Sequence, residues 1–201
     1  MASVVDISNL ALARLGDSAT VASIDPPEGS IQAEQCARFY PIARDSLLEA
    51  HEWKFATRRA VLAQLAVESF DWQFAYAEPA GAIKLLAVIP HTAGRDAKTS
   101  QYIAEGAEDG TPLILTDLED ATVRYIARVT DTTKFSPLFV DALAWLLASY
   151  LAGPVLKGDT GAAAAKSCYQ MARTVLSQAT VSDANQQHVQ PEHNPDWIAG
   201  R

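Results

Sequence analysis

Apolar residues recur with a helical period towards both ends of this chain and with a strand period in its middle. Helical spacing dominates residues 3–52 and 136–182, whereas residues 53–135 hold short apolar runs separated by turn residues. Successive strands with no helix between them favour an antiparallel sheet. The sequence therefore predicts an α+β fold, mainly α, in which N- and C-terminal helices form one bundle with a small inserted antiparallel β lobe.

Four segments follow from this pattern. We expect residues 1–52 to supply the N-terminal helices of the bundle and 53–135 to form the β insertion. Residues 136–182 should complete the bundle with the C-terminal helices. Residues 183–201 are polar and proline-bearing over most of their length, so they are predicted to form an extended C-terminal docking tail.

The helix starts carry clear signals. Ser3 can cap the first helix, with Asp6 at the fourth position of a capping box. Ser136 followed by Pro137 predicts another start, because proline fits the first helical position. Residues 138–151 are apolar nearly all round, which indicates a central helix.

Two prolines interrupt the helical pattern. Pro41 lies inside the second helix, whose pattern runs from about residue 30 to 52, and predicts a kink or a break there. Pro154, after Gly153, predicts that the central helix ends or bends.

The middle segment contains candidate strands bounded by turn residues. Residues 122–129 alternate between an apolar and a partly charged face, the pattern of a half-buried antiparallel strand. The predicted strands are 54–58, 60–65, 72–77, 83–89, 101–104, 112–116 and 122–129.

The sequence offers little chemistry. Cys36 and Cys168 lack partners at ligand spacing and are predicted to be buried free thiols. His188 and His193 lie in the polar tail and should be solvated. Phosphate-binding and dinucleotide-binding glycine motifs are absent from the sequence, and the serines have no recognisable base partner. We therefore predict no catalytic, metal-ligating or cofactor-binding residue, and no enzyme.

Charge and hydropathy constrain the partners. The net charge is −8, and residues 61–135 carry 11 acidic against 6 basic residues. This argues against a nucleic-acid binder, which needs a clustered basic face. The longest apolar run, about residues 142–152, is shorter than a membrane span, and the first residues do not resemble a secretory signal. We expect synthesis in a cytoplasm and no membrane partner.

Two segments stand out as structural or docking elements. At the change of period, Tyr40, Leu47, Trp53 and Phe55 are predicted to form the core where helix and sheet meet. Near the C-terminus, the pair 197–198 (Trp-Ile) is an aromatic–aliphatic anchor in a polar tail, the kind of group that a partner's pocket can hold.

The first of these segments resembles the tail tubular protein A group of podovirus-type phages, which are head-to-tail adaptors (connectors). The resemblance is carried by Ala13–Gly16, Cys36–Tyr40, Ala43–Glu49 and Trp53–Ala56, followed by a β insertion, an apolar helix and an Ala-rich last helix. The order of helices and strands is similar over most of the chain, whereas the sequence motif itself is short.

The resemblance implies a virion protein at the head–tail junction, assembled in the host cytoplasm. Its partners would be the phage portal protein, the tail nozzle or tail tube protein, and copies of itself in a ring, a dodecamer in such adaptors. Genomic DNA would pass through the ring without sequence-specific binding. By analogy, Trp197, Ile198 and Arg201 would dock on the portal or a neighbouring subunit.

Two alternatives remain open at this point. A head-completion or neck protein of a longer-tailed phage would also be built on a helical bundle. A compact neck protein, however, has little need of strands across residues 53–129. A ligand-binding or enzymatic module would use the β lobe to cover a pocket, with polar groups converging from Tyr76, Arg124 and Tyr102.

Overall fold

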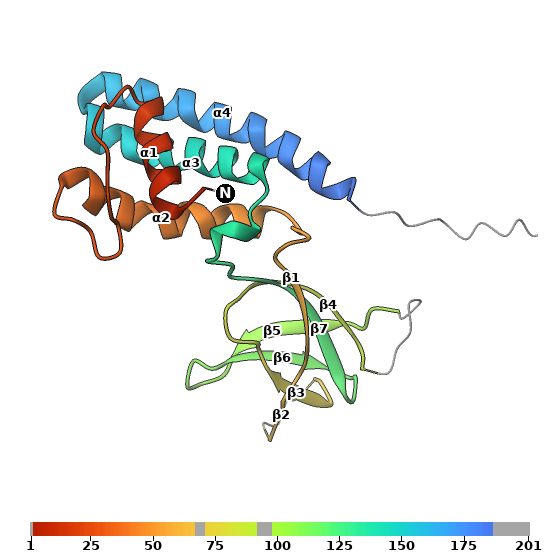
Figure 1. Cartoon of the computed structure of the whole chain (residues 1–201). Coiled ribbons are helices and arrows are strands. Elements are labelled where there is room, and N and C mark those ends of the chain that lie inside the picture. Colours follow the sequence, from red (N-terminus) through yellow and green to blue (C-terminus); the bar gives the residue numbers. More distant parts are fainter. Residues whose placement is uncertain (1, 67–70, 92–97, 187–201) are drawn as a thin grey trace, which may run out of the picture.

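The protein combines helices with antiparallel strands, and helix is about twice as abundant as strand among the described residues. The computed structural model describes residues 2–66, 71–91 and 98–186. It contains 46% helix and 23% strand, so the prediction of a mixed fold with inserted antiparallel strands is confirmed. Figure 1 shows a helical body, from which a β lobe projects on one side.

Four helices make up the helical body. Each of the others contacts α3, so α3 lies at the centre. Their bounds are α1 Val4–Arg14, α2 Ile31–Ala50, α3 Pro137–Leu156 and α4 Gly158–Ala184, and a short 3-10 turn, Thr132–Lys134, precedes α3.

The predicted helix starts are confirmed. The Ser3 side chain accepts from the Asp6 amide, and Asp6 accepts in return from the Ser3 amide, which completes the capping box. Ser136 caps α3 with Pro137 at its start. Each cap satisfies an amide that would otherwise lack a partner in the first turn.

Neither helix ends at its proline, although the sequence allowed a break at Pro41, as an alternative to a kink, and an end or a bend at Pro154. α2 runs through Pro41 without a break, and α3 continues past Pro154 to Leu156. Buried side chains on both sides of Pro41, such as Tyr40 and Ala43, hold α2 against the core. That packing offsets the lost hydrogen bond.

The apolar character of α3 reflects its central place, as predicted. Ten of its residues are buried, including Phe139, Leu143, Leu147 and Leu151. By length and composition α3 could also cross a membrane, and 56% of the apolar window is buried inside the protein. Central helices of compact bodies share this property, so it adds little about membranes.

Gly161, in the first turn of α4, lies against the backbone of α3. A Cβ added at Gly161 would lie 2.9 Å from the Ala152 carbonyl oxygen. In the alanine run 162–165 the first two residues are exposed, whereas Ala164 and Ala165 pack against the core of the helical body. Small residues, Gly161 and these two alanines, thus line the contact with α3.

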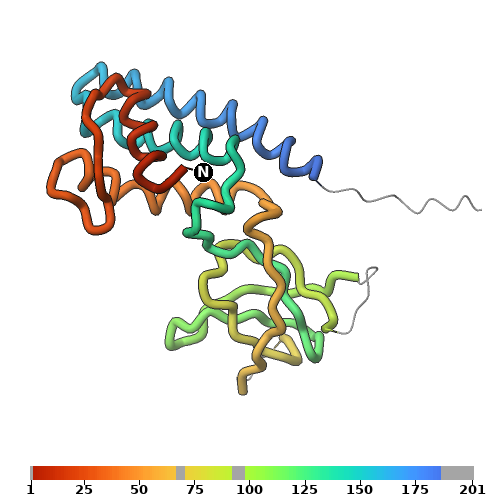
Figure 2. Tube along the Cα trace, viewed as in Figure 1, coloured from red at the N-terminus to blue at the C-terminus, as the bar shows by residue number. Residues whose placement is uncertain are grey.

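The β lobe consists of two antiparallel sheets, with strand orders β1-β7-β4 and β2-β3-β6-β5. The chain enters the lobe once after α2 and returns once after β7, as Figure 2 shows. The strands are β1 Thr57–Val61, β2 Gln64–Leu65, β3 Phe74–Ala77, β4 Ala82–Pro90, β5 Tyr102–Gly106, β6 Pro112–Thr116 and β7 Ala121–Ala127. Residues 54–56, predicted as strand, instead form a turn.

Strand β7 takes part in two cores. Val123 joins the small core of the lobe, whereas Ile126 joins the core of the helical body. The predicted half-buried alternation is therefore wrong, since Ile126 was placed on the partly charged face. As the central strand of its sheet, β7 is covered on both faces near the body.

Candidate functional site

The best-defined feature outside regular structure is the joint between helical body and β lobe. Trp53 is fully buried in the turn between α2 and β1, and its Nε1 donates to the Leu47 carbonyl oxygen over 2.6 Å. The Trp53 ring lies edge-on to Phe139, with 5.0 Å between centroids, and 5.8 Å from Phe55. Three of the predicted junction residues, Leu47, Trp53 and Phe55, therefore meet here.

Tyr40, the fourth predicted junction residue, lies earlier on α2. It belongs to the core of the helical body and is 4% exposed. Its hydroxyl has no hydrogen-bond partner, and burial raises the pKa of Tyr40 to about 12. Tyr40 therefore contributes to the body core and carries an unsatisfied polar group.

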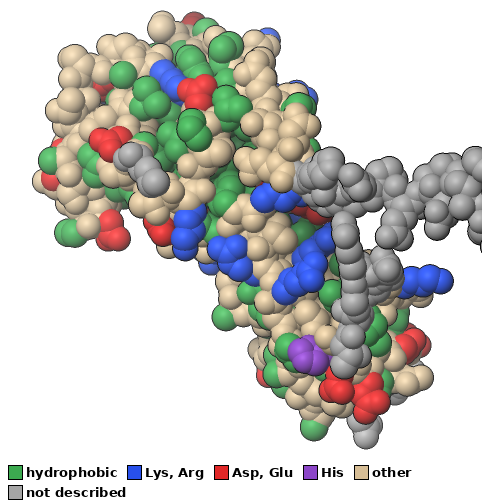
Figure 3. Space-filling model, turned by 45° about the vertical axis from the view of Figure 1, so that its right-hand side comes forward, with side chains coloured by type: hydrophobic (Ala, Val, Ile, Leu, Met, Phe, Trp, Pro, Cys, Tyr) green, Lys and Arg blue, Asp and Glu red, His purple; other side chains and the backbone are tan. Residues whose placement is uncertain are grey.

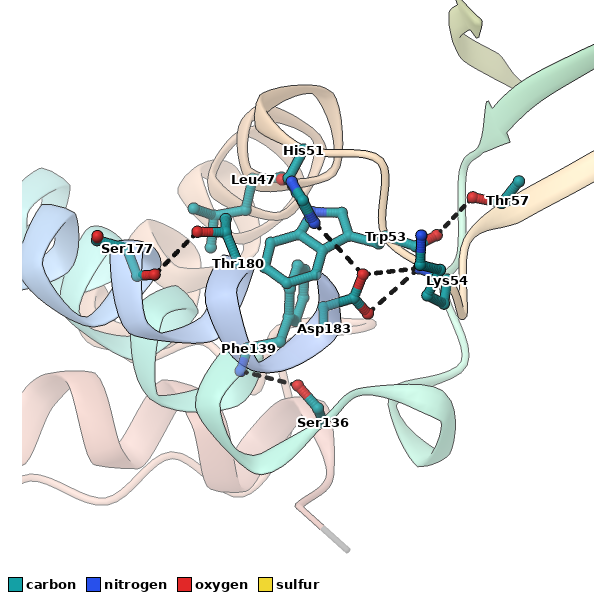
Figure 4. Close-up of polar contacts among 10 residues, drawn as sticks. All are labelled: Leu47, His51, Trp53, Lys54, Thr57, Ser136, Phe139, Ser177, Thr180 and Asp183. Carbon is teal, nitrogen blue, oxygen red and sulfur yellow. Dashed lines mark hydrogen bonds and ion pairs between the residues drawn. The ribbon is translucent and has the colours of Figure 1, made fainter. Parts of the chain in front are cut away.

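Asp183 ties the end of α4 to the joint (Figure 4). Both of its carboxylate oxygens accept from the Lys54 amide, each over 3.2 Å, and Oδ2 lies 3.3 Å from His51 Nε2. Asp183 is 6% exposed. We call Leu47, Trp53, Phe55, Phe139 and Asp183 the joint. It holds the turn that leads into the lobe against α2, α3 and α4.

Asp183 lies in the segment 183–201, which was predicted to form the C-terminal tail, so its place at the joint was not predicted. The helix ends at Ala184, so Asp183 belongs to its last turn. One signal was available: the buried positions of α4 follow a helical stripe through Ala172, Val175 and Ala179, and Asp183 continues it.

Beside the joint, ion pairs connect β7 and the residue after it to the end of α2 and the turn that follows α2. Arg128 Nε lies 3.0 Å from Asp45 Oδ2, and Arg124 Nη2 lies 3.6 Å from Glu52 Oε2. These side chains are substantially exposed, so each pair contributes about 0–1 kcal/mol.

Basic and acidic side chains gather in different places on the surface. Figure 3 shows Lys and Arg side chains in a band between helical body and β lobe, and acidic side chains at the far end of the lobe. The exposed basic residues around the joint include Lys54, Arg58, Arg59, Lys84 and Arg128. On this face basic side chains therefore gather near the joint and acidic ones at the far end of the lobe, an arrangement that suits contacts between proteins.

A second surface feature is the outer face of α4. This 27-residue helix is about 40 Å long at 1.5 Å per residue, and among the helices it packs chiefly on α3. Tyr169, Met171 and Val181 are 50%, 41% and 60% exposed. At about 100° per residue these three side chains point in different directions around the helix, so they are singly exposed apolar residues and not one continuous patch.

The described residues show no assembled reactive centre. No group of three or more possible metal ligands lies within residues 2–66, 71–91 and 98–186. The polar ends of Tyr76 and Arg124 have separate partners, the Leu118 carbonyl oxygen at 2.8 Å and Glu52. A ligand-binding or enzymatic module was expected to bring the polar groups of Tyr76, Arg124 and Tyr102 together. The polar ends of Tyr76 and Arg124 do not meet in this way.

The cysteines are free and buried, as predicted. Burial raises the pKa of the Cys36 thiol to about 11, which disfavours the reactive thiolate. Trp197, Ile198 and Arg201, predicted to dock on a partner, lie outside the described residues.

No protein-family model matches the chain, and no curated protein sequence matches it.

Proposed function

We propose that the protein is a structural virion protein of a tailed phage, a head-to-tail adaptor that forms a ring between the portal and the tail nozzle or tail tube. In this proposal α1–α4 act as a helical bundle that builds the ring, a dodecamer as the resemblance implies. DNA passes through the lumen without sequence-specific contacts, and the protein performs no catalysis.

The observation that carries the proposal is the joint. Two of the four segments by which the chain resembles the adaptor family, residues 43–49 and 53–56, lie where the helical body meets the β lobe. From the segment 43–49 come the buried Ala43, Leu47 and Leu48, and from 53–56 come Trp53 and Ala56. A motif that holds the helical body and the β lobe in a fixed orientation suits a structural subunit, which must present the same contact surfaces in every copy of a ring.

Two surface features support a role in assembly. The exposed apolar side chains of α4 offer single points of contact for a neighbouring subunit or the portal, and the opposite charges near and far from the body can orient such contacts. The net charge of −8 disfavours tight binding to DNA phosphates.

The size of the lobe favours the adaptor over a compact neck protein. Its seven strands extend from Thr57 to Ala127, so the lobe is a substantial second part with its own buried residues.

Mass photometry of the full chain mixed with the portal protein encoded in the same genome tests the proposal. We expect one species with the mass of the portal ring plus several copies of the chain. Free portal and free chain at all concentrations tested would contradict the proposal.

Two matched substitutions locate the contact. Val181→Asp on α4 should weaken assembly at least tenfold, because a charge in an apolar contact is costly to desolvate. Val61→Asp, at an equally exposed position on β1, is the control and should assemble like the wild type. Equal effects of both substitutions would remove α4 as the assembly face.

A further inference from the structure

The sheet β1-β7-β4 carries two arginines side by side on one face. Arg59 on β1 and Arg124 on β7 are direct partners in the antiparallel register. The Leu62 amide donates to the Ala121 carbonyl oxygen three positions along the same ladder. Because hydrogen-bonded pairs alternate with open pairs, Arg59 and Arg124 form an open pair, in which side chains come closest, with about 4.5–5.5 Å between Cβ atoms. Two guanidinium groups therefore start from neighbouring points of the sheet.

The positive charge of this pair is only partly compensated. Arg124 has one carboxylate nearby, with 3.6 Å between its Nη2 and Glu52 Oε2, and its buried Nε has no hydrogen-bond partner. Arg59 is exposed and forms no ion pair with an acidic side chain among the described residues. Like charges directly opposite each other destabilise an antiparallel pair. An anion from outside the chain would therefore be attracted to both side chains at once.

A third cation belongs to the same face of the sheet. Lys84 on β4 is the register partner of Ile126, which follows Arg124 by two positions and therefore points to the same side of β7. The Lys84 Nζ donates to the Glu49 carbonyl oxygen over 3.4 Å, near the end of α2, and the side chain is exposed. Each strand of the sheet thus contributes one basic residue to this face, in the region where Figure 3 shows Lys and Arg side chains gathered.

The donors and the charge of this face suit a phosphate group. A guanidinium presents its N–H donors in a planar fork that matches two oxygens of a phosphate or a carboxylate. Glu52 supplies one carboxylate to Arg124 and leaves Arg59 and Lys84 without an acidic partner among the described residues. A phosphate group carries up to two negative charges, whereas a carboxylate carries one. A phosphate therefore neutralises the remaining charge better than a second carboxylate would.

We infer that Arg59 and Arg124 form a phosphate-binding site on this face of the sheet, with Lys84 at its border. The ligand is either free phosphate or a phosphate of a nucleic-acid backbone, bound without contact to bases. Binding is weak, because Arg59 is exposed and the chain as a whole has a net charge of −8. The inference concerns the single chain and stands whether or not the chain binds a portal.

Titration of the full chain with inorganic phosphate at constant ionic strength, followed by amide NMR, tests the inference. We expect chemical-shift changes centred on Arg59 and Arg124 that saturate with a dissociation constant of about 1–10 mM, as for a solvent-exposed charged contact. Acetate at the same ionic strength represents a carboxylate and should shift the same amides less. The absence of a saturable change, or an equal response to acetate, would overturn the inference.

Matched variants locate the site. Arg59→Gln should lower the phosphate affinity about tenfold, because its charge-assisted hydrogen bonds are lost. Arg173→Gln, at an exposed position on α4, removes the same charge elsewhere and should leave the affinity unchanged. Equal effects of the two variants would show a response to net charge alone and overturn the assignment. Without phosphate and at low ionic strength, Arg59→Gln should raise the melting temperature slightly, since it relieves the like-charge pair; a marked decrease would give Arg59 a structural role instead.

Duplex DNA of arbitrary sequence distinguishes the two sources of the phosphate group. If the backbone is the source, fluorescence anisotropy at low salt should detect weak binding, and Arg59→Gln should reduce the slope of log affinity against log salt by about 1, the value for one phosphate contact. Saturable binding of inorganic phosphate without binding of DNA would support the site with free phosphate as its ligand. Binding of DNA that Arg59→Gln and Arg173→Gln weaken equally would contradict the site.

Discussion

The helical body and the β lobe are stabilised in different ways. The body has one continuous core that runs through all four helices, whereas the lobe has two small clusters of buried side chains. The lobe is also connected to the body core through Ile126 on β7 and through the turn that holds Trp53. Small cores are marginal on their own, so we expect the lobe to depend on the joint for its stability.

The largest effect should come from removing the shared aromatic side chain. Trp53→Ala should lower the free energy of unfolding by about 3–5 kcal/mol, because it leaves a cavity and removes packing from both parts. Urea denaturation measures this. Trp72→Ala, at a half-buried lobe position, is the control with a smaller loss. A loss below about 1 kcal/mol for Trp53→Ala would show that the joint is unimportant.

A body-specific effect is expected at the crossing of α3 and α4. Gly161→Ala should destabilise by about 1–3 kcal/mol, since the new Cβ would meet the Ala152 carbonyl oxygen. Gly153→Ala, whose Cβ would meet nothing within 4 Å, should stabilise by about 0.5–1 kcal/mol. Thermal unfolding followed by circular dichroism compares the two. If both substitutions changed the stability in the same direction, the contact between Gly161 and the Ala152 carbonyl would be refuted.

The polar half of the joint should matter less. Asp183→Ala removes the acceptor of the Lys54 amide and should cost about 1–3 kcal/mol. Hydrogen exchange should show faster exchange of the Lys54 amide. Ser182→Ala, next to it and exposed, should change stability by less than about 0.5 kcal/mol. Unchanged exchange at Lys54 would exclude the carboxylate as its anchor.

The smallest effect is expected within the lobe alone. Tyr76→Phe loses the hydrogen bond to the Leu118 carbonyl and should cost about 0.5–1.5 kcal/mol. Exchange of the lobe amides should accelerate while those of α3 stay protected. Tyr169→Phe on the exposed face of α4 serves as the control. Equal acceleration in α3 would indicate that lobe and body unfold as one unit.

Local signals predicted much of the fold. The caps at Ser3 and Ser136 depend on residues close in sequence, and β6 begins and ends where its turn residues indicate. The apolar residues Leu47, Trp53 and Phe55 were predicted to meet because the period changes beside them. Short-range spacing is sufficient for such features.

The remaining features depend on partners far apart in the chain. Asp183 binds an amide 129 residues away, and the burial of Ile126 depends on the helices that cover its sheet. Pro41 stays inside α2 because tertiary packing outweighs a local preference. None of these can be read from the residues next to them. Whether residues 197–198 dock stays a prediction.

The most direct test of the proposed role is cryo-electron microscopy of the chain mixed with the portal of the same genome. The account predicts a closed ring at the tail-side end of the portal, with body and lobe in one fixed orientation in every copy and α4 at a protein contact. Particles of bare portal, with the chain remaining as separate single copies, would contradict it.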